Sequence, residues 1–485
     1  MEGLRENRTT FVLCFVFCDR CVGLRTDAGR FSPLLHPADC RFLRMTAFRL
    51  WALLLLAVPA AKGGGVTWTD RGASTIKRMN FDGSGLVTVP VSGGLSSPGS
   101  NLRGIALDPA GGRMFWADNG ADRILRANLD GSSTVILASL PTGFPADVRV
   151  DPATQRVFFC DQQRNLLQRM GYDGTALTTV IDPAGANQPY FLEVVPGTPK
   201  VYWGGFVSGS IYRANTDGTA VETIITGNNT VRGVCLDTAG GMIYWINRDD
   251  KKVHRCALSA LPVNVTTSPA VQTLYQGLDT PHGLALDLPA RKLYWADTGS
   301  NTGLGVGDKA VSRGDIDGAT PQEVLAAGSE PWDADIDPRC NNYAEWRARY
   351  FRKDAPVGVT APDADPDKDG SNNLLEYAGG SHPLRADLQP VRMEGFIFRD
   401  AVTGFPHLAL RYYRRPAATD LSYYVQVSTN LSDWRDSRSA GIQPTVVEVS
   451  SEPAPDYMLL VTSRAEARFD TGVKSFLRVS VELRP

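Results

Sequence analysis

The sequence predicts an all-β protein, and three repeated features indicate how its strands are arranged. A short strand with two large aromatic residues, such as Leu-Tyr-Trp-Ala-Asp at residues 293–297, recurs through the first two thirds of the chain. The second aromatic position falls at residues 68, 116, 159, 203, 245 and 295, so successive copies are 42 to 50 residues apart. A strand ending at Asp precedes most copies, and a strand ending in Asp-Gly follows most of them. A repeat of this length with several strands is typical of a β-propeller.

Each repeat contains four segments that correspond to the strands of one propeller blade. The first is apolar and ends at Asp, as at residues 104–108, and the second is the aromatic strand. The third ends in Asp-Gly, as at residues 124–131, and this dipeptide favours the positive φ angles of a tight turn. A fourth short strand follows, for instance at residues 221–225.

The two ends of the repeat region are complementary. The first aromatic strand, residues 66–70, has no Asp-terminated strand before it, and the last Asp-terminated strand, residues 332–338, has no aromatic strand after it. Placed side by side, these two strands complete one blade. We therefore expect the N-terminal strand to close a ring of six blades, which removes exposed sheet edges.

Length and composition limit the functional classes. A chain of 485 residues is too long for one compact core and indicates two or three domains. The net charge is −2 and no Lys/Arg cluster stands out, so we expect no nucleic-acid partner.

Residues 45–61 have the features of a secretory signal peptide. A short basic segment is followed by an apolar stretch and a small-residue exit. The apolar stretch is too short to span a bilayer comfortably, so we expect no integral membrane segment in the mature chain. Because a signal belongs at a true N-terminus, our hypothesis is that Met45 is the start and that residues 1–44 are a doubtful upstream extension. The alternative is a genuine leader that uses the apolar residues 11–17.

The cysteines do not indicate a disulfide framework. Four of the eight lie in the doubtful extension, at spacings that do not match a zinc site. The other four are Cys160, Cys235, Cys256 and Cys340, spread too widely for a disulfide-rich fold. Cys160 and Cys235 sit in apolar strands, which favours buried thiols over redox sites. The alternative for Cys235 is a disulfide with Cys256, which falls in the same repeat.

Residues 365–376 carry the most specific chemical pattern in the chain. Acidic residues occupy positions 1, 3 and 5, Gly occupies position 6 and Glu occupies position 12, which is the pattern of an EF-hand calcium loop. The predicted ligands are the side chains of Asp365, Asp367, Asp369, Asn373 and Glu376 and the carbonyl of Ser371. Polar Asn372 at position 8 argues against a paired regulatory EF-hand, so we expect structural Ca²⁺. The alternative is an Asp-rich turn that caps a helix at residues 373–378.

The region after the propeller divides into two parts. Residues 340–385 contain an aromatic helical face at 342–351, then prolines, then the calcium loop. Residues 386–485 show six or seven short alternating strands, which predicts a β-sandwich.

The repeats resemble the YWTD six-bladed propeller, the class B repeat of the low-density-lipoprotein receptor, over roughly residues 62–339. The residues that carry this resemblance are the Tyr-Trp-Ala-Asp strand, Leu-Asp-Pro at 107–109 and Arg-Ala-Asn-Leu-Asp-Gly at 126–131. Two copies, at 201–205 and 243–247, lose the Asp, and no Cys-rich EGF-like module follows. These departures argue against a lipoprotein-receptor role but not against the fold.

The C-terminal part carries two further resemblances. The calcium loop looks like the lone loops of dockerins and other extracellular modules. The order of segments through Asn-Leu-Ser-Asp-Trp at 430–434 resembles the C-terminal regions of secreted proteins of Verrucomicrobia and Planctomycetes. The resemblance implies a bacterial protein that is secreted, periplasmic or displayed on the cell surface.

Candidate ligand contacts lie where the innermost strands begin, near the central mouth. The residues five positions before the Asp of the first strands include Arg, Tyr and Trp, which are enriched at binding hot spots. The candidates are Arg103, Tyr190, Arg232, His282 and Trp332. The resemblance implies that this face binds a protein segment or another extended ligand. The alternative is a solvated rim without a dedicated partner.

We expect a non-catalytic binding protein. The alternative is a metal-dependent hydrolase or lactonase of the gluconolactonase type, which resembles this chain in outline. The inner strands supply Asp147, Asp333 and Glu193, but no ordered Glu/Asn/Asp metal set. A third interpretation is a purely structural cell-surface protein.

Overall fold

A computed structural model describes residues 64–91, 100–299, 309–328, 330–386, 393–436, 446–469 and 475–484. It also describes the backbone of a three-stranded sheet formed by β1 (Cys14–Cys18), β2 (Cys21–Arg25) and β3 (Phe31–Pro33). The chain divides into two units, Ala61–Arg339 and Met1–Ala60 with Cys340–Pro485. The predicted signal peptide at 45–61 lies outside the described residues.

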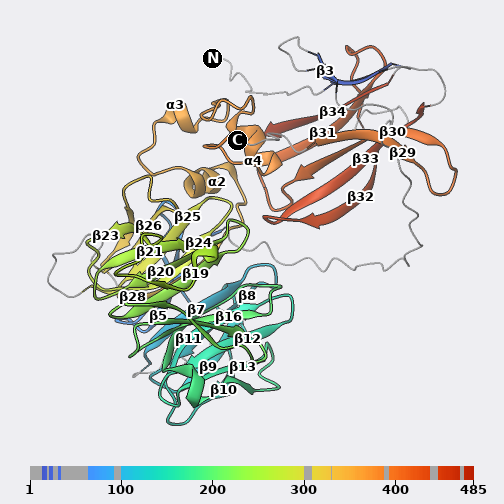
Figure 1. The fold of residues 1–485 in the computed structure, drawn as a ribbon. Helices are drawn as coiled ribbons and strands as arrows, with labels where there is room; N and C mark the ends of the chain where they lie inside the picture. Colours follow the sequence, from blue (N-terminus) through green and yellow to red (C-terminus); the bar gives the residue numbers. More distant parts are fainter. Residues whose placement is uncertain are drawn as a thin grey trace. The chain divides into compact units, whose positions relative to one another are not determined.

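The Ala61–Arg339 unit is a β-propeller, coloured blue to yellow in Figure 1. Its described residues form six sheets whose strands run antiparallel, apart from one parallel pair. From the inner strand outward, the first three are β7 (Leu102–Asp108), β8 (Arg113–Asp118), β9 (Arg123–Asn128), β10 (Val135–Ser139); β11 (Pro145–Asp151), β12 (Arg156–Asp161), β13 (Leu166–Gly171), β14 (Thr178–Ile181); and β15 (Pro189–Val194), β16 (Lys200–Gly205), β17 (Ile211–Asn215), β18 (Glu222–Thr226), β22 (Val263–Asn264). The others are β19 (Val231–Asp237), β20 (Met242–Asn247), β21 (Lys252–Ala257), β23 (Gln272–Gln276); β24 (Pro281–Asp287), β25 (Lys292–Asp297), β26 (Ala310–Asp315), β27 (Glu323–Ala327); and β28 (Pro331–Asp337), β4 (Gly65–Asp70), β5 (Thr75–Met79), β6 (Val87–Val89).

The inner strands close into a ring. In the order β7, β11, β15, β19, β24 and β28, each contacts the next, and β28 contacts β7. β28 pairs antiparallel with β4, with Asp333 opposite Thr69 and Asp337 opposite Gly65. This pairing confirms that the N-terminal strand closes the ring, as the complementary ends of the repeat region predict.

The aromatic strands form the cores between sheets. The tryptophans of these strands are fully buried, at 0–1% exposure: Trp68, Trp116, Trp203, Trp245 and Trp295. Trp203, on β16, packs with Phe158 and Leu167 of the preceding sheet, and Trp245, on β20, packs with Ile211 and Ile224 of its preceding sheet. Large rings between sheets bury much apolar area, which makes the repeat a packing signal rather than a ligand site.

The Asp-Gly turns have the predicted backbone. Gly131 has a φ of 85°, which is accessible to glycine without strain. The preceding Asp130 accepts hydrogen bonds from the Ser132 backbone N (2.9 Å) and Oγ (2.6 Å). The turn therefore depends on both residues of the dipeptide and on the hydroxyl that follows.

One sheet has a strand that the sequence pattern did not predict. The segment between β21 and β23 contains η1 (Leu258–Ala260) and β22, and β22 pairs in parallel with β18 of the preceding sheet. This extra strand covers part of the outer edge of β18. A short helix, α1 (Pro183–Ala186), precedes β15.

The pairing of Cys235 with Cys256 is wrong. Both thiols are free and buried, on β19 and β21, and β20 lies between these strands. Burial raises the pKa of the Cys256 thiol to about 11. Both thiols are therefore unreactive and pack in the core, and for Cys235 this agrees with its apolar strand.

The C-terminal unit combines three helices with a β-sandwich (Figure 1). The helices are α2 (Tyr343–Tyr350), α3 (Val357–Thr360) and α4 (Asn373–Gly379). One sheet has the order β29 (Met393–Arg399), β30 (Pro406–Arg414), β33 (Met458–Arg468), β32 (Val446–Ala454), and the other pairs β31 (Leu421–Ser428) with β34 (Phe476–Leu483). The aromatic face of α2 packs on α4, with ring centroids of Trp346 and Tyr377 5.8 Å apart. Among the described residues, no helix has the length and apolarity needed to cross a bilayer.

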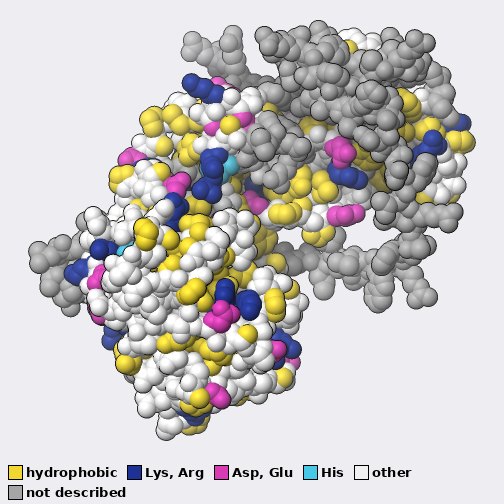
Figure 2. Space-filling model, in the orientation of Figure 1, with side chains coloured by type: hydrophobic (Ala, Val, Ile, Leu, Met, Phe, Trp, Pro, Cys, Tyr) yellow, Lys and Arg dark blue, Asp and Glu magenta, His cyan; other side chains and the backbone are white. Residues whose placement is uncertain are grey.

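Basic and acidic side chains are interspersed on the face that Figure 2 shows, without a large block of either sign. This distribution agrees with the net charge of −2.

Candidate functional site

The candidate mouth residues lie at a shared irregularity of the inner strands. All six inner strands shift register near their first residues, between 102 and 105, 145 and 147, 189 and 191, 232 and 234, 281 and 284, and 331 and 333. In β11, β15 and β28 the residue left without a ladder partner is Ala146, Tyr190 or Trp332. A bulge re-aims a side chain out of the strand alternation. The repeated bulge therefore explains how residues from separate sheets meet at one place.

The structure brings the five candidate side chains together in one stack, here called the rim cluster: Arg103, Tyr190, Arg232, His282 and Trp332. The Arg103 guanidinium lies 3.7 Å from the Trp332 ring centroid, and the His282 ring stacks on Trp332 at 3.8 Å. Tyr190 meets Trp332 edge-on at 6.2 Å, and the Arg232 guanidinium lies 4.4 Å from the Tyr190 ring. The exposed fractions are only 3–6%, so the rim cluster is packed and not solvated.

Three cation–aromatic contacts of the rim cluster were not predicted from the sequence. Phe144 lies 5.5 Å from the Arg103 guanidinium, Phe206 lies 5.0 Å from that of Arg232, and the Arg71 guanidinium lies 5.5 Å from the Trp332 ring. Arg71 and Phe206 directly follow the second strands β4 and β16. Aligning the residue after each aromatic strand would have found these two.

The two buried arginines of the rim cluster form no direct ion pair among the described residues, although the charge of Asp249 acts on Arg232. Arg103 Nε and Nη1 and Arg232 Nε are buried without a hydrogen-bond acceptor, although Arg232 Nη1 donates to the Val231 carbonyl at 2.9 Å. Burial lowers the pKa of Arg103 to about 10, against the opposing effect of Tyr190, and Arg71 lowers it further. Burial likewise lowers the pKa of Arg232 to about 10. A buried cation without a counter-charge is costly, and the aromatic faces compensate only in part.

His282 is neutral within this cationic surrounding. Burial moves its pKa well below the usual range, and Arg232, Arg248, Arg103 and Arg71 all act in the same direction. Its Nδ1 is buried without a hydrogen-bond partner. The rim cluster therefore combines positive charge, aromatic faces and unsatisfied polar atoms.

Deeper in the ring, the acids named for the hydrolase alternative are engaged by an arginine. Arg149 Nη1 lies 2.9 Å from Asp147 Oδ1 and 2.9 Å from Asp333 Oδ2, and it donates to the Ile105 carbonyl at 3.1 Å. Asp147 Oδ2 also accepts from Leu192 N at 2.9 Å, and Asp333 Oδ2 from Ile105 N at 3.0 Å. These bonds link β7, β11, β15 and β28, so the acids join neighbouring sheets.

Two further acids face this network. Burial raises the pKa of Glu193 to about 7, while Arg149 opposes the shift. Burial also raises the pKa of Asp335 to about 6, again opposed by Arg149. Both side chains are partly exposed. Among the described residues, these acids do not form a group of three close enough to share one metal ion.

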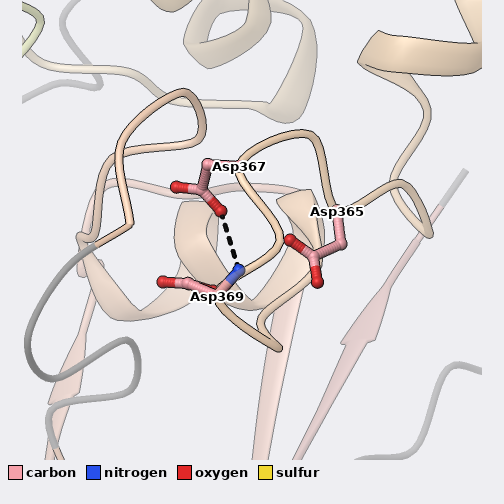
Figure 3. A group of neighbouring side chains, drawn as sticks. All are labelled: Asp365, Asp367 and Asp369. Atoms are coloured by element: carbon pink, nitrogen blue, oxygen red, sulfur yellow. Dashed lines mark hydrogen bonds between the residues drawn. The ribbon is translucent and has the colours of Figure 1, made fainter.

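The group that is close enough lies in the C-terminal unit. Figure 3 shows the side chains of Asp365, Asp367 and Asp369 gathered around one loop. One oxygen of each lies within 4.8 Å of the others. One oxygen of each carboxylate accepts a loop N–H: Asp367 Oδ1 from Asp369 N (3.2 Å), Asp365 Oδ2 from Gly370 N (3.1 Å) and Asp369 Oδ1 from Ser371 N (2.8 Å). The other oxygens, Asp365 Oδ1, Asp367 Oδ2 and Asp369 Oδ2, are buried without hydrogen-bond partners. Burial, opposed by its bond from Asp369 N, raises the pKa of Asp367, and the charges of Asp369 and Asp365 add to the increase.

Asn373 is oriented so that its oxygen stays available. Its Nδ2 donates to the carbonyls of Val359 (2.9 Å) and Ala361 (2.8 Å), and its Oδ1 is buried without a partner. Ser371 and Glu376 are also buried, at 1% and 0% exposure. Glu376, in the first turn of α4, lies outside the group within 4.8 Å. The structure thus gathers three of the predicted side-chain ligands and orients a fourth.

Comparison with known proteins finds no protein-family model and no curated protein that matches the chain. A structure of a nidogen/laminin complex is similar at a TM-score of 0.48 and 18% identity, covering 56% of this chain and 98% of that chain. TolB from Acinetobacter baumannii is similar at 0.43 and 14%, covering 56% and 66%. A calcium-binding protein, regucalcin, from Agrobacterium tumefaciens is similar at 0.36 and 16%, covering 46% and 73%. The class of this protein, a β-propeller followed by a β-sandwich, rests on the sheet topology.

Proposed function

We propose that the protein is a binding module whose rim cluster holds an anionic segment of an extracellular protein or another extended ligand. The observation that supports this is the pair of buried arginines, Arg103 and Arg232, which have N–H groups without acceptors and form no ion pair in the described chain. A carboxylate supplies both the missing acceptors and a close counter-charge. Exposed Arg71 adds positive charge beside Trp332, whereas Arg248 is paired with Asp249 at 3.0 Å.

The test measures binding of a fluorescent acidic peptide, hexa-aspartate, against hexa-asparagine. The substitutions Arg103→Met and Arg232→Met keep much of the side-chain volume and remove the charge. We expect each to weaken binding of hexa-aspartate by at least about tenfold, because the partner carboxylate is then left unpaired. Arg213→Met is the matched control, since Arg213 pairs with Glu222 on the outer strands.

Two outcomes would contradict this function. Equal binding of the acidic and amide peptides would show that charge does not drive binding. Wild-type affinity in both rim variants would show that the rim cluster is not the binding site. A pull-down from extracellular medium, repeated with Arg232→Met, then identifies the natural partner if the rim cluster is correct.

We propose, second, that residues 365–376 bind structural Ca²⁺. Oxygen ligands suit this hard cation, and the loop offers buried, unpaired oxygens on Asp365, Asp367, Asp369 and Asn373. Glu376 and the Ser371 carbonyl would complete the set. Titration calorimetry on chelator-treated protein should show one site, lost in Asp369→Ala and retained in Asp433→Asn, an exposed acid of the same unit. No heat and no thermal shift with calcium would refute the site.

The alternative is a metal-dependent hydrolase of the gluconolactonase type. The pKa of about 7 for Glu193 suits a general base, which supports this alternative. The engagement of Asp147 and Asp333 by Arg149 argues against it. Lactone hydrolysis that requires a divalent metal and is lost in Glu193→Gln would favour the enzyme.

The signal-like segment at 45–61 supports a secreted, periplasmic or cell-surface location. Sequencing the N-terminus of the mature protein tests whether Met45 is the start of a cleaved signal: a mature chain that retains Arg5 or Arg25 would contradict that hypothesis.

A further inference from the structure

Helix α4 is attached to the predicted calcium loop at its N-terminal end. Asn373 N donates to the Ala364 carbonyl at 2.8 Å, and Leu374 N donates to the Pro362 carbonyl at 2.9 Å. Asn372 caps the helix by accepting from Leu375 N at 3.0 Å. These bonds use N–H groups that a helix cannot satisfy internally. The loop and the first turn of α4 therefore form one hydrogen-bonded unit.

The other end of α4 is attached to the β-sandwich. The carbonyls of Tyr377 and Ala378 accept from Arg415 Nε (2.9 Å) and Tyr423 Oη (2.9 Å). The last carbonyls of a helix are otherwise left to solvent. Gly380 follows so close to β33 that an added Cβ would lie 3.3 Å from Met458 Cγ.

Asp420, between β30 and β31, connects both helices to the sandwich. Its Oδ1 accepts from Tyr377 Oη at 2.8 Å, and its Oδ2 accepts from the backbone N of Tyr343 at 2.7 Å. Tyr343 begins α2, and Tyr377 directly follows Glu376 in α4. Both rings touch, with centroids 5.6 Å apart. One carboxylate of the sandwich therefore holds α2 and α4, the two helices that pack around the loop.

We propose that Asp420 is a positioning residue for the metal loop, and that calcium binding is coupled to the docking of α2 and α4 on the sandwich. This inference rests on the calcium site proposed above. Metal in the loop favours one position of α4, and Asp420 favours the same position from the other side. Coupling of this kind is reciprocal, so each event strengthens the other by the same factor.

The experiment uses the full chain and calcium chloride as the probe. Titration calorimetry and calcium-dependent thermal unfolding are measured for the wild type, Asp420→Asn and Tyr377→Phe. Asp433→Asn is the matched control, because this exposed acid lies in the same unit and accepts from Asn430 Nδ2 of its own turn at 2.7 Å. We expect the two coupling variants to bind calcium about 5- to 20-fold more weakly, within the range typical of coupled sites. Their calcium-induced rise in the Tm of the C-terminal unit should be smaller than that of the wild type, because stabilisation by a ligand depends on the logarithm of its affinity.

The outcomes separate the two proposals. If the wild type binds no calcium, the calcium site fails and the coupling fails with it. If the wild type and Asp369→Ala behave as predicted but Asp420→Asn and Tyr377→Phe keep wild-type affinity, only the coupling is overturned. Should Asp420→Asn fail to fold, Tyr377→Phe decides the question, because it removes a single hydroxyl.

Discussion

Arg149 shows how one side chain can stabilise two buried acids on separate inner strands of the propeller. It lies on β11, and its guanidinium neutralises Asp147 on its own strand and Asp333 on β28. Both carboxylates are at 0% exposure. The residue therefore allows two buried acids to act as links between sheets instead of as destabilising charges.

Replacing Arg149 with Met should lower the free energy of unfolding of the propeller by about 3–5 kcal/mol, because two buried carboxylates lose their counter-charge. Urea denaturation followed by tryptophan fluorescence measures the change. Arg156→Met, an exposed position on the neighbouring strand β12, should change stability by less than about 0.5 kcal/mol. Similar losses of unfolding free energy in the two variants would show that Arg149 does not stabilise the closed ring of inner strands.

Asn373 has a similar stabilising role in the calcium loop, where one side chain donates to two carbonyls. Asn373→Asp keeps an oxygen but removes the two N–H donors to Val359 and Ala361, and it adds charge beside three carboxylates. In chelator, we expect the C-terminal unit to lose about 1–3 kcal/mol of stability. Added calcium should recover part of this loss.

Denaturation in chelator and in calcium measures both effects. Asn430→Asp, in an exposed turn of the same unit, is the control. A calcium-independent loss in Asn373→Asp would argue that Asn373 is purely structural.

At the scale of elements, the inner strands combine small and acidic residues. A Cβ on Gly283 would lie 1.9 Å from Asp333 Oδ1, and one on Gly104 would lie 2.1 Å from Asp147 Oδ1. Each glycine thus leaves room for the acid of the next inner strand.

Gly283→Ala should therefore destabilise the propeller by at least about 1–3 kcal/mol, since the added methyl group overlaps a fixed carboxylate. Thermal unfolding of the full chain provides the measurement. Gly358→Ala is the control, because a Cβ there meets nothing within 4 Å. A tolerated Gly283→Ala would mean that β28 can move away from β24.

At the scale of the whole molecule, the propeller carries an unusual pH dependence. Burial raises the pKa of Glu193 to about 7 and of Asp335 to about 6, whereas unfolded carboxyls titrate near 4. Between about pH 4 and 7 these two groups therefore bind more protons in the folded chain than in the unfolded chain. Their contribution to stability is fully present below about pH 4 and is lost as the pH rises to about 7. Burial lowers the pKa of His254 to about 4 and that of His282 well below its usual range, so these histidines act in the opposite direction below about pH 6.5.

We expect the change in the Tm of the propeller transition from pH 5 to pH 8 to be more favourable in Glu193→Gln than in the wild type, because the variant lacks the destabilising ionisation of Glu193. Calorimetry at both pH values tests the expectation. Glu394→Gln, in the C-terminal unit, controls for the loss of one acid. An unchanged slope in Glu193→Gln would show that Glu193 ionises normally in the folded protein.

The calcium loop could be predicted from the sequence more completely than the rim cluster. The calcium loop is twelve consecutive residues, so its spacing alone predicts that Asp365, Asp367 and Asp369 meet, and they do. The rim cluster combines residues up to 229 positions apart, from Arg103 to Trp332. Aligning the repeats correctly placed these residues at one end of the inner strands, but the alignment did not predict their stacking or burial. The bulges and the residues after the second strands decide those properties.

Local patterns in the sequence predicted most of the strands, the Asp-Gly turns and the three acids of the loop, because alternation, dipeptides and short spacings act within one repeat. The complementary ends of the repeat region predicted the closure of the ring, although β4 and β28 lie far apart in the chain. The sequence did not predict that Arg149 joins Asp147 to Asp333, that Arg103 and Arg232 are buried without direct ion pairs, or that Asp420 binds α2 and α4. The physical reason is that these contacts join strands from different sheets, or helices to a sandwich, and exist only after the units have folded. The binding proposal and the inference about Asp420 therefore rest on long-range contacts, whereas the calcium site rests mainly on a local pattern.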